Sequence, residues 1–262
     1  MPRIAIGIEY DGRRYCGWQR QTHALSVQQL IETAVARVAD EPVVVNAAGR
    51  TDAGVHAIGQ VAHFDTSAQR QPRSWLLGIS SHLPPDVSIS WAQETAPDFD
   101  ARYSAHARTY RYLILNRPAR SALWAGRAWW LHGALDISAM RAAALPLLGE
   151  QDFTAFRATQ CQARSPRREL QLLDISEYAP FVCFNVRANA FLHHMVRNLV
   201  GSLLPVGRGD RPSSWPAEVL ASRDRRLAGM TAPADGLHLV RVHYPERFSI
   251  PLPAAGLLPG DL

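Results

Sequence analysis

Apolar and polar residues follow two different periods along the chain, and the period indicates where strands and helices are expected. Apolar residues at every second position predict strands, whereas apolar residues spaced by three and four predict helices. The clearest helix is Ser26–Asp40, which opens with the capping-box pair Ser26 and Gln29. Strands are expected at 4–10, 43–47, 59–65, 87–93, 107–116, 169–178, 181–189 and 236–244, and helices at 26–40, 73–82, 137–148, 191–204 and 215–224.

The order strand, helix, strand, strand recurs in both halves, so the sequence predicts two related α/β units. No residue-level repeat accompanies this order. We expect an N-terminal half at 1–105, a C-terminal half at 106–247, and a surface tail rich in Pro, Gly and Leu at 248–262. In the second half, Asp136 is expected to cap helix 137–148, and Pro146 to kink it or end it early.

Composition indicates a folded protein with a preference for polyanions. The 262 residues are 47% hydrophobic, which is enough for a sizeable core, and the net charge of +5 favours a polyanionic partner. All 28 basic residues are Arg, an absence of Lys that biased coding explains as well as selection does. It excludes a Lys Schiff base, a P-loop Lys and a Lys general base.

Cysteine usage and the apolar runs bear on the compartment. Cys16, Cys161 and Cys183 are scattered without metal-ligand spacing, which fits a reducing environment. The start MPRIAIGIEYDG alternates like a strand and lacks the apolar centre of a signal peptide. The most apolar long segment, 122–148, is interrupted by charged residues and a histidine, so no transmembrane helix is expected. We expect a soluble, cytoplasmic protein.

Several common catalytic patterns are absent or incomplete. Gly49–Gly54 has the glycine spacing of a phosphate-binding loop, but Val and His follow where Lys and Ser or Thr are required. His193 and His194, placed on a helix, are expected to point about 100° apart and not to share a metal. No Ser lies in a G-x-S-x-G pattern, and no second carboxylate is marked as a partner of Asp52. The sequence predicts neither a metal nor a cofactor, and one nucleophilic acid is the remaining option.

Asp52 and Arg197 are the best candidates for that chemistry. Asp52 precedes Ala53 and Gly54 in a turn before an apolar strand, a position that an ordinary β-turn explains equally well. Arg197 borders the apolar stripe of helix 191–204, where an unpaired guanidinium is costly and needs an anion. Asp52 and an RNA phosphate are both candidate anions, and a snorkelling surface arginine is the alternative. Pairing with Arg197 would keep the Asp52 carboxylate ionised and oriented, as a nucleophile requires.

Six segments, in order over 14–245, together resemble the TruA family of tRNA pseudouridine synthases. They are RYCGWQRQ (14–21), AGRTDAGVHAIGQVAHF (48–64), FDARYSAHARTYRYLILN (99–116), DFTAFRATQCQARSPRREL (152–170), NAFLHHMVRNLVGSLL (189–204) and TAPADGLHLVRVHYP (231–245). The resemblance implies the pseudouridine synthase fold, which is α/β (α+β). It has two related halves with mainly antiparallel sheet, flanked by helices, around a central active-site cleft.

The resemblance also implies a reaction and roles for individual residues. The reaction is the isomerisation of uridine to pseudouridine at positions 38, 39 and 40 of the tRNA anticodon stem-loop, with base flipping and without a cofactor. Asp52 matches the nucleophile, and whether it attacks C1′, attacks C6 or assists loss of the 2′ proton stays open. Arg50 resembles an arginine that holds the flipped nucleotide, and Arg197 the one paired with the aspartate. Tyr110 matches the residue that stacks on the target base, and Leu237 the apolar residue that closes the pocket.

The sequence also suggests contacts with RNA and with a second copy of the chain, and it leaves two alternative functions open. Charge clustering marks six arginines as candidate contacts to the RNA backbone, although basic runs commonly face solvent: Arg13, Arg14, Arg20, Arg164, Arg167 and Arg168. The family is homodimeric, and the Trp-rich segment 123–133 is either an apolar patch for dimerisation or buried in the monomer. A non-catalytic RNA-binding module would leave uridines unaltered, and a carboxylate-based nucleoside hydrolase would release uracil.

Overall fold

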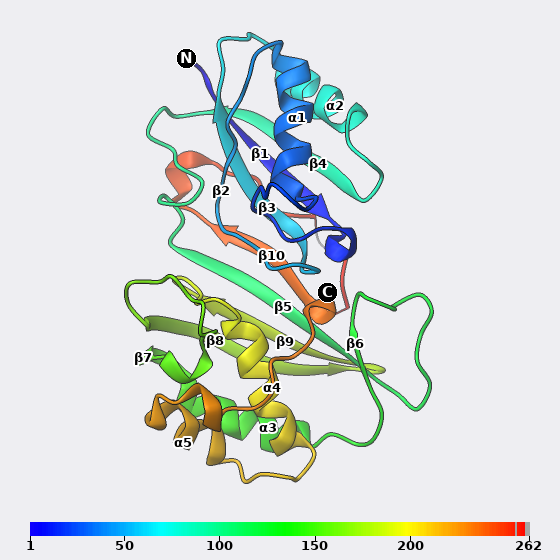
Figure 1. The fold of residues 1–262 in the computed structure, drawn as a ribbon, viewed down its shortest axis with the longest axis vertical. Helices are drawn as coiled ribbons and strands as arrows, with labels where there is room; N and C mark the ends of the chain where they lie inside the picture. The colour runs from blue at the N-terminus through cyan, green and yellow to red at the C-terminus, as the bar shows by residue number, and fades with distance from the viewer. Residues whose placement is uncertain (255, 260–262) are drawn as a thin grey trace. The chain divides into compact units, whose positions relative to one another are not determined.

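The structure, a computed structural model, describes residues 1–254 and 256–259 (Figure 1). Its chain divides into two compact units. The first comprises Met1–His106 with the segment from His238, and the second comprises Ala107–Leu237 with the segment from Gly256. The domain boundaries at 105 and 247, which we expect from the sequence, stay a prediction. Within the described residues, no helix combines the length and the apolar character needed to cross a membrane.

The first unit is a sheet covered by two helices. Its strands are β1 (Arg3–Tyr10), β2 (Asn46–Ala47), β3 (His56–Asp65), β4 (Val87–Thr95) and β10 (Leu237–His243). The order is β4-β1-β3-β10, with β2 paired to β3; β1 runs antiparallel to both β3 and β4, and β10 runs parallel to β3. Helices α1 (Val27–Ala39) and α2 (Pro72–Ser81) lie on one face of this sheet (Figure 1).

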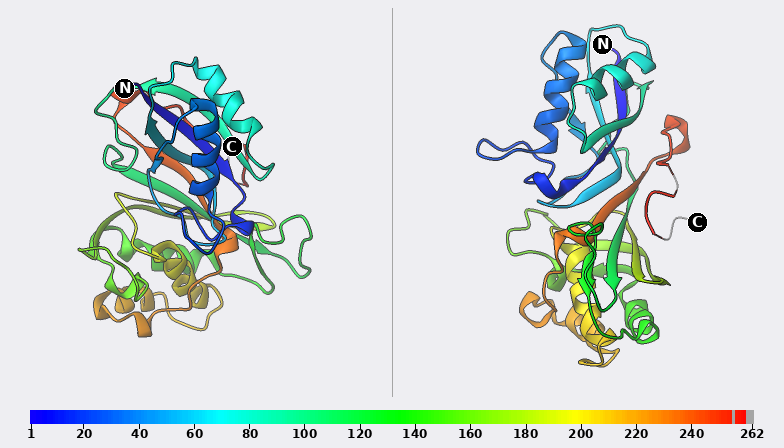
Figure 2. Two further views of the ribbon diagram at one scale, coloured as in Figure 1. Left: turned by 45° about the horizontal axis from the view of Figure 1, so that its top comes forward. Right: turned by 90° about the vertical axis from the view of Figure 1, so that its right-hand side faces the viewer.

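The second unit also consists of a sheet and helices, here three of them among the described residues. Its strands are β5 (Ala107–Asn116), β6 (Trp129–Leu131), β7 (Gly149–Asp152), β8 (Arg167–Tyr178) and β9 (Phe181–Ala188). The order is β5-β9-β8-β7, all antiparallel, and β6 pairs in parallel with β5. Helices α3 (Ile137–Ala144), α4 (Met195–Gly207) and α5 (Trp215–Ser222) pack together in this unit (Figure 2). The mixed α/β composition and the mainly antiparallel sheet confirm the predicted fold class.

Helix α1 forms where the apolar period predicts it, but the predicted capping box is wrong. Ser26 occupies the N-cap position, yet its hydroxyl is buried without a hydrogen-bond partner. The first backbone N–H groups of the helix bond elsewhere: Val27 N donates to Gly17 O at 3.3 Å, and Gln28 N donates to Trp18 O at 3.0 Å. Carbonyls of a distant loop therefore replace the Ser26 hydroxyl as acceptors.

Helix α4 begins at Met195, four residues later than the apolar pattern predicts. His194 precedes it in the left-handed region with φ 62°, so the chain before Met195 is a turn and not a helix. The expected 100° divergence of His193 and His194 is therefore wrong, and their ring centroids lie 4.1 Å apart. The predicted apolar stripe is confirmed, because all six of its residues are buried: Leu192, Met195, Val196, Leu199, Val200 and Leu203.

The shorter elements differ more from the expectation. The strand predicted at 43–47 is reduced to the two residues of β2, and the sequence pattern did not indicate β6 or β7. Strand β7 reads GEQD and β6 has three residues, so neither shows a readable period. Helix α3 ends at Ala144 before a 3₁₀ turn that contains Pro146, which confirms the early end. The Asp136 side chain caps it by accepting from Ala139 N at 2.8 Å.

Candidate active site

Asp52 lies in a tight turn of the first unit, between β2 and β3. The turn is closed by the bond from Val55 N to Asp52 O at 3.2 Å, and Gly54 has φ 80°, which favours glycine. The Asp52 side chain is half-buried, and Arg50 is exposed in the same loop. Both predicted site residues therefore lie in the loop that leads into β3.

Neighbouring backbone fixes the loop on one flank. Trp18 N donates to Thr51 O at 3.1 Å, and Gly54 N donates to Tyr15 O at 3.3 Å. Gly17 has φ 81°, and a β-carbon there would overlap the Thr51 carbonyl oxygen. Only glycine at this position allows the 15–18 segment to approach the loop so closely.

Two side chains fix the loop from the sheet beneath. The Tyr10 hydroxyl, at the end of β1, shares a hydrogen bond of 2.8 Å with the buried Thr51 Oγ1. Burial raises the pKa of Tyr10 to about 12, so this phenol stays protonated at neutral pH. From β3, Gln60 Nε2 donates to Gly49 O at 2.9 Å. Asp52 is therefore held on a loop that is tied to β1 through the Thr51 side chain and to β3 through the Gly49 backbone.

Tyr110 lies in strand β5 of the second unit. It is on β5 opposite Val186 of β9, and 9% of it is exposed. Its ring meets Phe191 edge to face, with centroids 5.1 Å apart and planes at 85°. The strand pairing fixes the backbone of Tyr110, and the aromatic contact packs its ring against Phe191.

Arg197 lies in the first turn of α4 and is held by the segment that precedes β10. Its Nε donates to Ala232 O at 2.7 Å, and Ala232 N donates back to Arg197 O at 3.1 Å. The next residue in that segment, Pro233, accepts a bond from the Tyr112 hydroxyl at 2.8 Å. Burial raises the pKa of Tyr112, and the positive charge of Arg197 opposes this rise. Arg197 therefore lies near Tyr112, two residues along β5 from Tyr110.

Leu237, the last of the predicted pocket residues, begins β10 and is buried, with 6% exposed. It follows the 3₁₀ turn Ala234–Gly236, directly after the segment that contacts Arg197. Tyr110, Arg197 and Leu237 thus belong to the second unit, whereas Asp52 and Arg50 belong to the first.

Four of the six candidate RNA-binding arginines form ion pairs within the chain. Arg13 pairs with Asp11 at 2.6 Å, Arg14 with Asp86 at 3.3 Å, Arg20 with Glu32, and Arg167 with Glu150 at 3.6 Å. A phosphate would compete with these carboxylates for the same guanidinium groups.

The other two candidates differ from these four. Arg164 is exposed. Arg168 is half-buried, with Nε buried without a hydrogen-bond partner, and burial lowers its pKa. A buried guanidinium nitrogen without an acceptor is costly, and Nη1 of the same side chain donates to Ser165 O at 3.0 Å.

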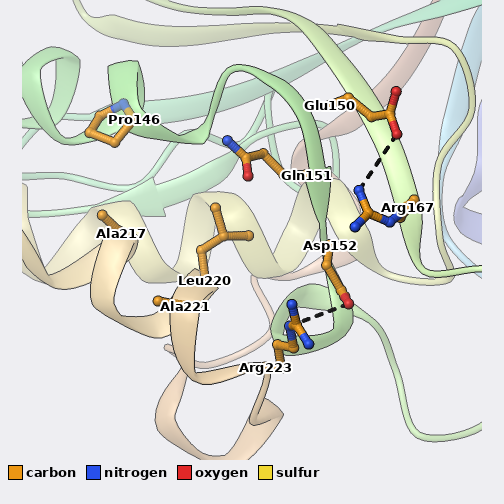
Figure 3. Close-up of a pocket in the computed structure, with 9 residues that line it drawn as sticks. All are labelled: Pro146, Glu150, Gln151, Asp152, Arg167, Ala217, Leu220, Ala221 and Arg223. Carbon is orange, nitrogen blue, oxygen red and sulfur yellow. Dashed lines mark ion pairs between the residues drawn. The ribbon is translucent and has the colours of Figure 1, made fainter.

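A cavity of about 460 Å³ lies elsewhere in the second unit, beside β7 and α5 (Figure 3). Two ion pairs line it: Arg167 with Glu150 at 3.6 Å, and Arg223 with Asp152 at 3.4 Å. Of the predicted site residues, only Arg167 lines this cavity. The carboxylates compensate the arginines, so the cavity offers a mixed surface and no concentrated charge.

Sequence reasoning missed the residues that support the site. Tyr10 and Thr51 are 41 positions apart, and Asn198 and Thr231 are 33 apart. Each reads locally as an ordinary strand, loop or helix residue. The available signal was burial, because a polar residue placed in an apolar stripe, as Asn198 is in α4, needs a hydrogen-bond partner.

Comparison with known proteins identifies the class of protein to which the chain belongs. The profile of a family described as tRNA pseudouridine synthase matches residues 6–104 and 143–245. The chain belongs to this family, whose members are isomerases that convert uridine to pseudouridine in tRNA.

Individual relatives match over nearly their whole length, and each is named tRNA pseudouridine synthase A. The protein from Hydrogenovibrio crunogenus is 53% identical over 251 residues, which cover 96% of each chain. The protein from Paraburkholderia xenovorans is 51% identical, covering 99% of this chain and 96% of the relative. The protein from Escherichia fergusonii is also 51% identical, covering 98% of this chain and 95% of the relative.

Proposed function

We propose that this chain isomerises uridine to pseudouridine at positions 38, 39 and 40 of the tRNA anticodon stem-loop, with Asp52 as the nucleophile. The observation that carries the proposal is the loop at Asp52. Trp18 and Gln60 donate hydrogen bonds to its backbone, and the Tyr10 hydroxyl bonds the Thr51 side chain, while Asp52 is half-buried at the turn. An ordinary surface turn needs no such support, whereas a nucleophile must be held in one geometry.

The proposed reaction is balanced within the substrate. The N1–C1′ bond breaks, the uracil rotates, and a C5–C1′ bond forms while the proton on C5 is lost and N1 gains one. No electron pair or group leaves the nucleotide, so the reaction needs no oxidant, reductant or co-substrate. Asp52 acts at C1′, at C6, or in removal of the 2′ proton, and each of these roles requires its ionised carboxylate.

The remaining residues are assigned to binding and to charge. Arg197 stabilises the carboxylate of Asp52, and Arg50 holds the flipped nucleotide. Flipping a base out of a stem costs about a few kcal/mol, and stacking on the Tyr110 ring returns about 1–3 kcal/mol of this. Leu237 closes the pocket with apolar surface.

The partner proposals are broader. The arginines at 13, 14, 20, 164, 167 and 168 contact the RNA backbone, consistent with the net charge of +5. The chain acts as a homodimer in the cytoplasm, and the exposed side chains of Leu123 and Trp130 are candidates for the apolar dimer contact.

The test is direct. An unmodified tRNA transcript with uridine at 38, 39 and 40 is incubated with purified protein, and pseudouridine is mapped by carbodiimide treatment and primer extension. We expect conversion at these positions only, with no free uracil by chromatography. Conversion at other positions would contradict the site assignment, release of uracil would indicate a hydrolase, and binding without conversion would indicate an RNA-binding module.

A further inference from the structure

A polar network is buried beside Arg197 in the second unit. Its centre is Asn198, which is fully buried in α4; Nδ2 donates to Phe156 O at 2.7 Å. Asn198 Oδ1 accepts two bonds, from Arg225 Nη2 at 3.0 Å and from Thr231 Oγ1 at 2.7 Å. The amide therefore links α4 to two residues that lie beyond α5 in sequence.

Arg225 is the residue that joins this network to the segment beside Arg197. Its Nη1 donates to Gly229 O at 2.8 Å, and Nη2 donates to Thr231 Oγ1 at 3.0 Å as well as to Asn198. Burial lowers the pKa of Arg225, as expected for a guanidinium surrounded by neutral acceptors. Removing a cation from water costs free energy, and a neutral side chain could hold a loop without that cost. The Arg225 guanidinium differs in offering several N–H donors in one plane, which fix the direction of the groups that it binds.

The segment 229–233 has no regular secondary structure and depends on these contacts for its position. Gly229 N donates to the Oγ of Ser202 in α4 at 2.9 Å. Ala232 then exchanges two bonds with Arg197, one through the Arg197 Nε and one through its carbonyl oxygen. The position of Ala232 thus sets the direction of the Arg197 guanidinium.

We propose that Arg225 is a positioning residue for Arg197: it fixes the 229–232 segment against Asn198, and so aims the Arg197 guanidinium. The proposal rests on the role of Arg197 in the proposed function. Arg225 and Thr231 act together, because they share one acceptor on Asn198. Ala232 transmits their effect through its carbonyl oxygen.

The test measures the single-turnover rate of pseudouridine formation and the Kd for tRNA. Arg225→Met is expected to lower the rate by about 10- to 100-fold, as small misplacement of a catalytic group does, while Kd changes by less than about 3-fold. Arg226→Met is the matched control, because Arg226 is 89% exposed and pairs with Asp224. We expect its rate to equal that of the wild type.

A second variant makes the smallest possible change to the network. Thr231→Val removes one hydroxyl with little change in volume and is expected to lower the rate in the same direction, whereas Thr231→Ser restores most of it. This pair also answers the question if Arg225→Met does not fold. A Thr231→Val rate equal to that of the wild type would overturn the proposal.

A double-mutant cycle separates positioning from general destabilisation. In an Arg197→Lys background, which lacks Nε and the planar fork, adding Arg225→Met is expected to change the rate by less than about 2-fold. A merely structural role would lower the rate by the same factor in both backgrounds. That result would overturn the proposal.

A readout independent of activity distinguishes this proposal from the proposed function. The Arg197 Nε–H signal, assigned in ¹⁵N-labelled protein by its loss in Arg197→Lys, is expected to shift and exchange faster in Arg225→Met. An unchanged signal would overturn the positioning role. If the signal changes but the wild type forms no pseudouridine, the positioning stands and the proposed function fails.

Discussion

At the scale of single residues, the two units support their candidate side chains in different ways. The loop of Asp52 is fixed by backbone bonds at Thr51 and Gly54 and by the bond between the Thr51 hydroxyl and Tyr10 of β1. Tyr110 and Arg197 are fixed through their own side chains, one by an aromatic contact and one by a carbonyl oxygen. Substitutions at Tyr110 and Arg197 therefore also disturb their neighbours, whereas substitutions of Asp52 leave its loop anchored.

Truncating Tyr110 tests the stacking role. Tyr110→Ala is expected to lower the single-turnover rate by about 5- to 150-fold, because the flipped base loses about 1–3 kcal/mol of stacking. Tyr103→Ala is the control, since 78% of Tyr103 is exposed. Thermal unfolding verifies that each variant is folded. A folded Tyr110→Ala protein with the wild-type rate would exclude stacking on this ring.

The ion pair between Arg3 and Asp65 predicts that the free energy of unfolding depends on pH. Arg3 donates through Nε to Asp65 Oδ1 at 2.7 Å across the β1–β3 pair, and this bond lowers the pKa of Asp65 below 3.8. The carboxylate therefore adds stability above about pH 4 and loses it as the pH falls through the lowered pKa.

Denaturation in urea measures this effect. Asp65→Asn is expected to reduce the free energy of unfolding at pH 7 by up to about 1 kcal/mol, since the pair is partly exposed. The difference from the wild type is expected to shrink at pH 3. Asp98→Asn, an exposed carboxylate that pairs with Arg247, controls for net charge. A difference that grows in acid would contradict the assignment.

At the scale of elements, the N-termini of α1 and α3 predict different losses of stability when their N-cap residues are replaced. Asp136 accepts a bond from Ala139 N, whereas the buried Ser26 hydroxyl has no partner. Asp136→Ala is expected to cost about 1 kcal/mol of unfolding free energy. Ser26→Ala is expected to cost less than about 0.5 kcal/mol or to stabilise, because it removes an unpaired buried polar group. Equal losses at both positions would contradict this interpretation.

The same helices show how far the sequence predicts the fold. Long periodic elements were located well: strand β5 has the predicted bounds, and α1 differs from its prediction by one residue at each end. The predicted start of α4 is wrong because His194 has a left-handed backbone with φ 62°, which the pattern of apolar residues does not encode. The polar β7 becomes a strand by pairing with β8, which its own residues do not indicate.

For the candidate site, the sequence predicts the site residues but not the residues that support them. The family resemblance indicates Asp52, Tyr110 and Arg197, and the period of apolar residues predicts the strand that carries Tyr110. Their support is not predicted, because the Tyr10 hydroxyl and the Arg225 guanidinium reach their partners only after the chain has folded.

At the scale of the whole molecule, charge predicts how binding to tRNA depends on salt. Each phosphate contact contributes about 0.7–0.9 to the slope of log K against log salt. Replacing Arg167 and Arg168 with Gln is expected to lower the slope by up to about 1.8. Arg226→Gln, which is exposed at 89%, is the control and is expected to leave the slope unchanged. A slope equal to that of the wild type would remove both arginines from the interface.

The central claim is that the Asp52 carboxylate performs the isomerisation. The most direct measurement compares wild type, Asp52→Asn and Asp52→Ala on the same tRNA transcript, with single-turnover conversion and Kd measured together. Loss of the nucleophile is expected to lower the rate by at least about 10³-fold while Kd stays within about 3-fold. A variant that binds the tRNA and still forms pseudouridine within 10-fold of the wild-type rate would show that Asp52 is only a turn residue.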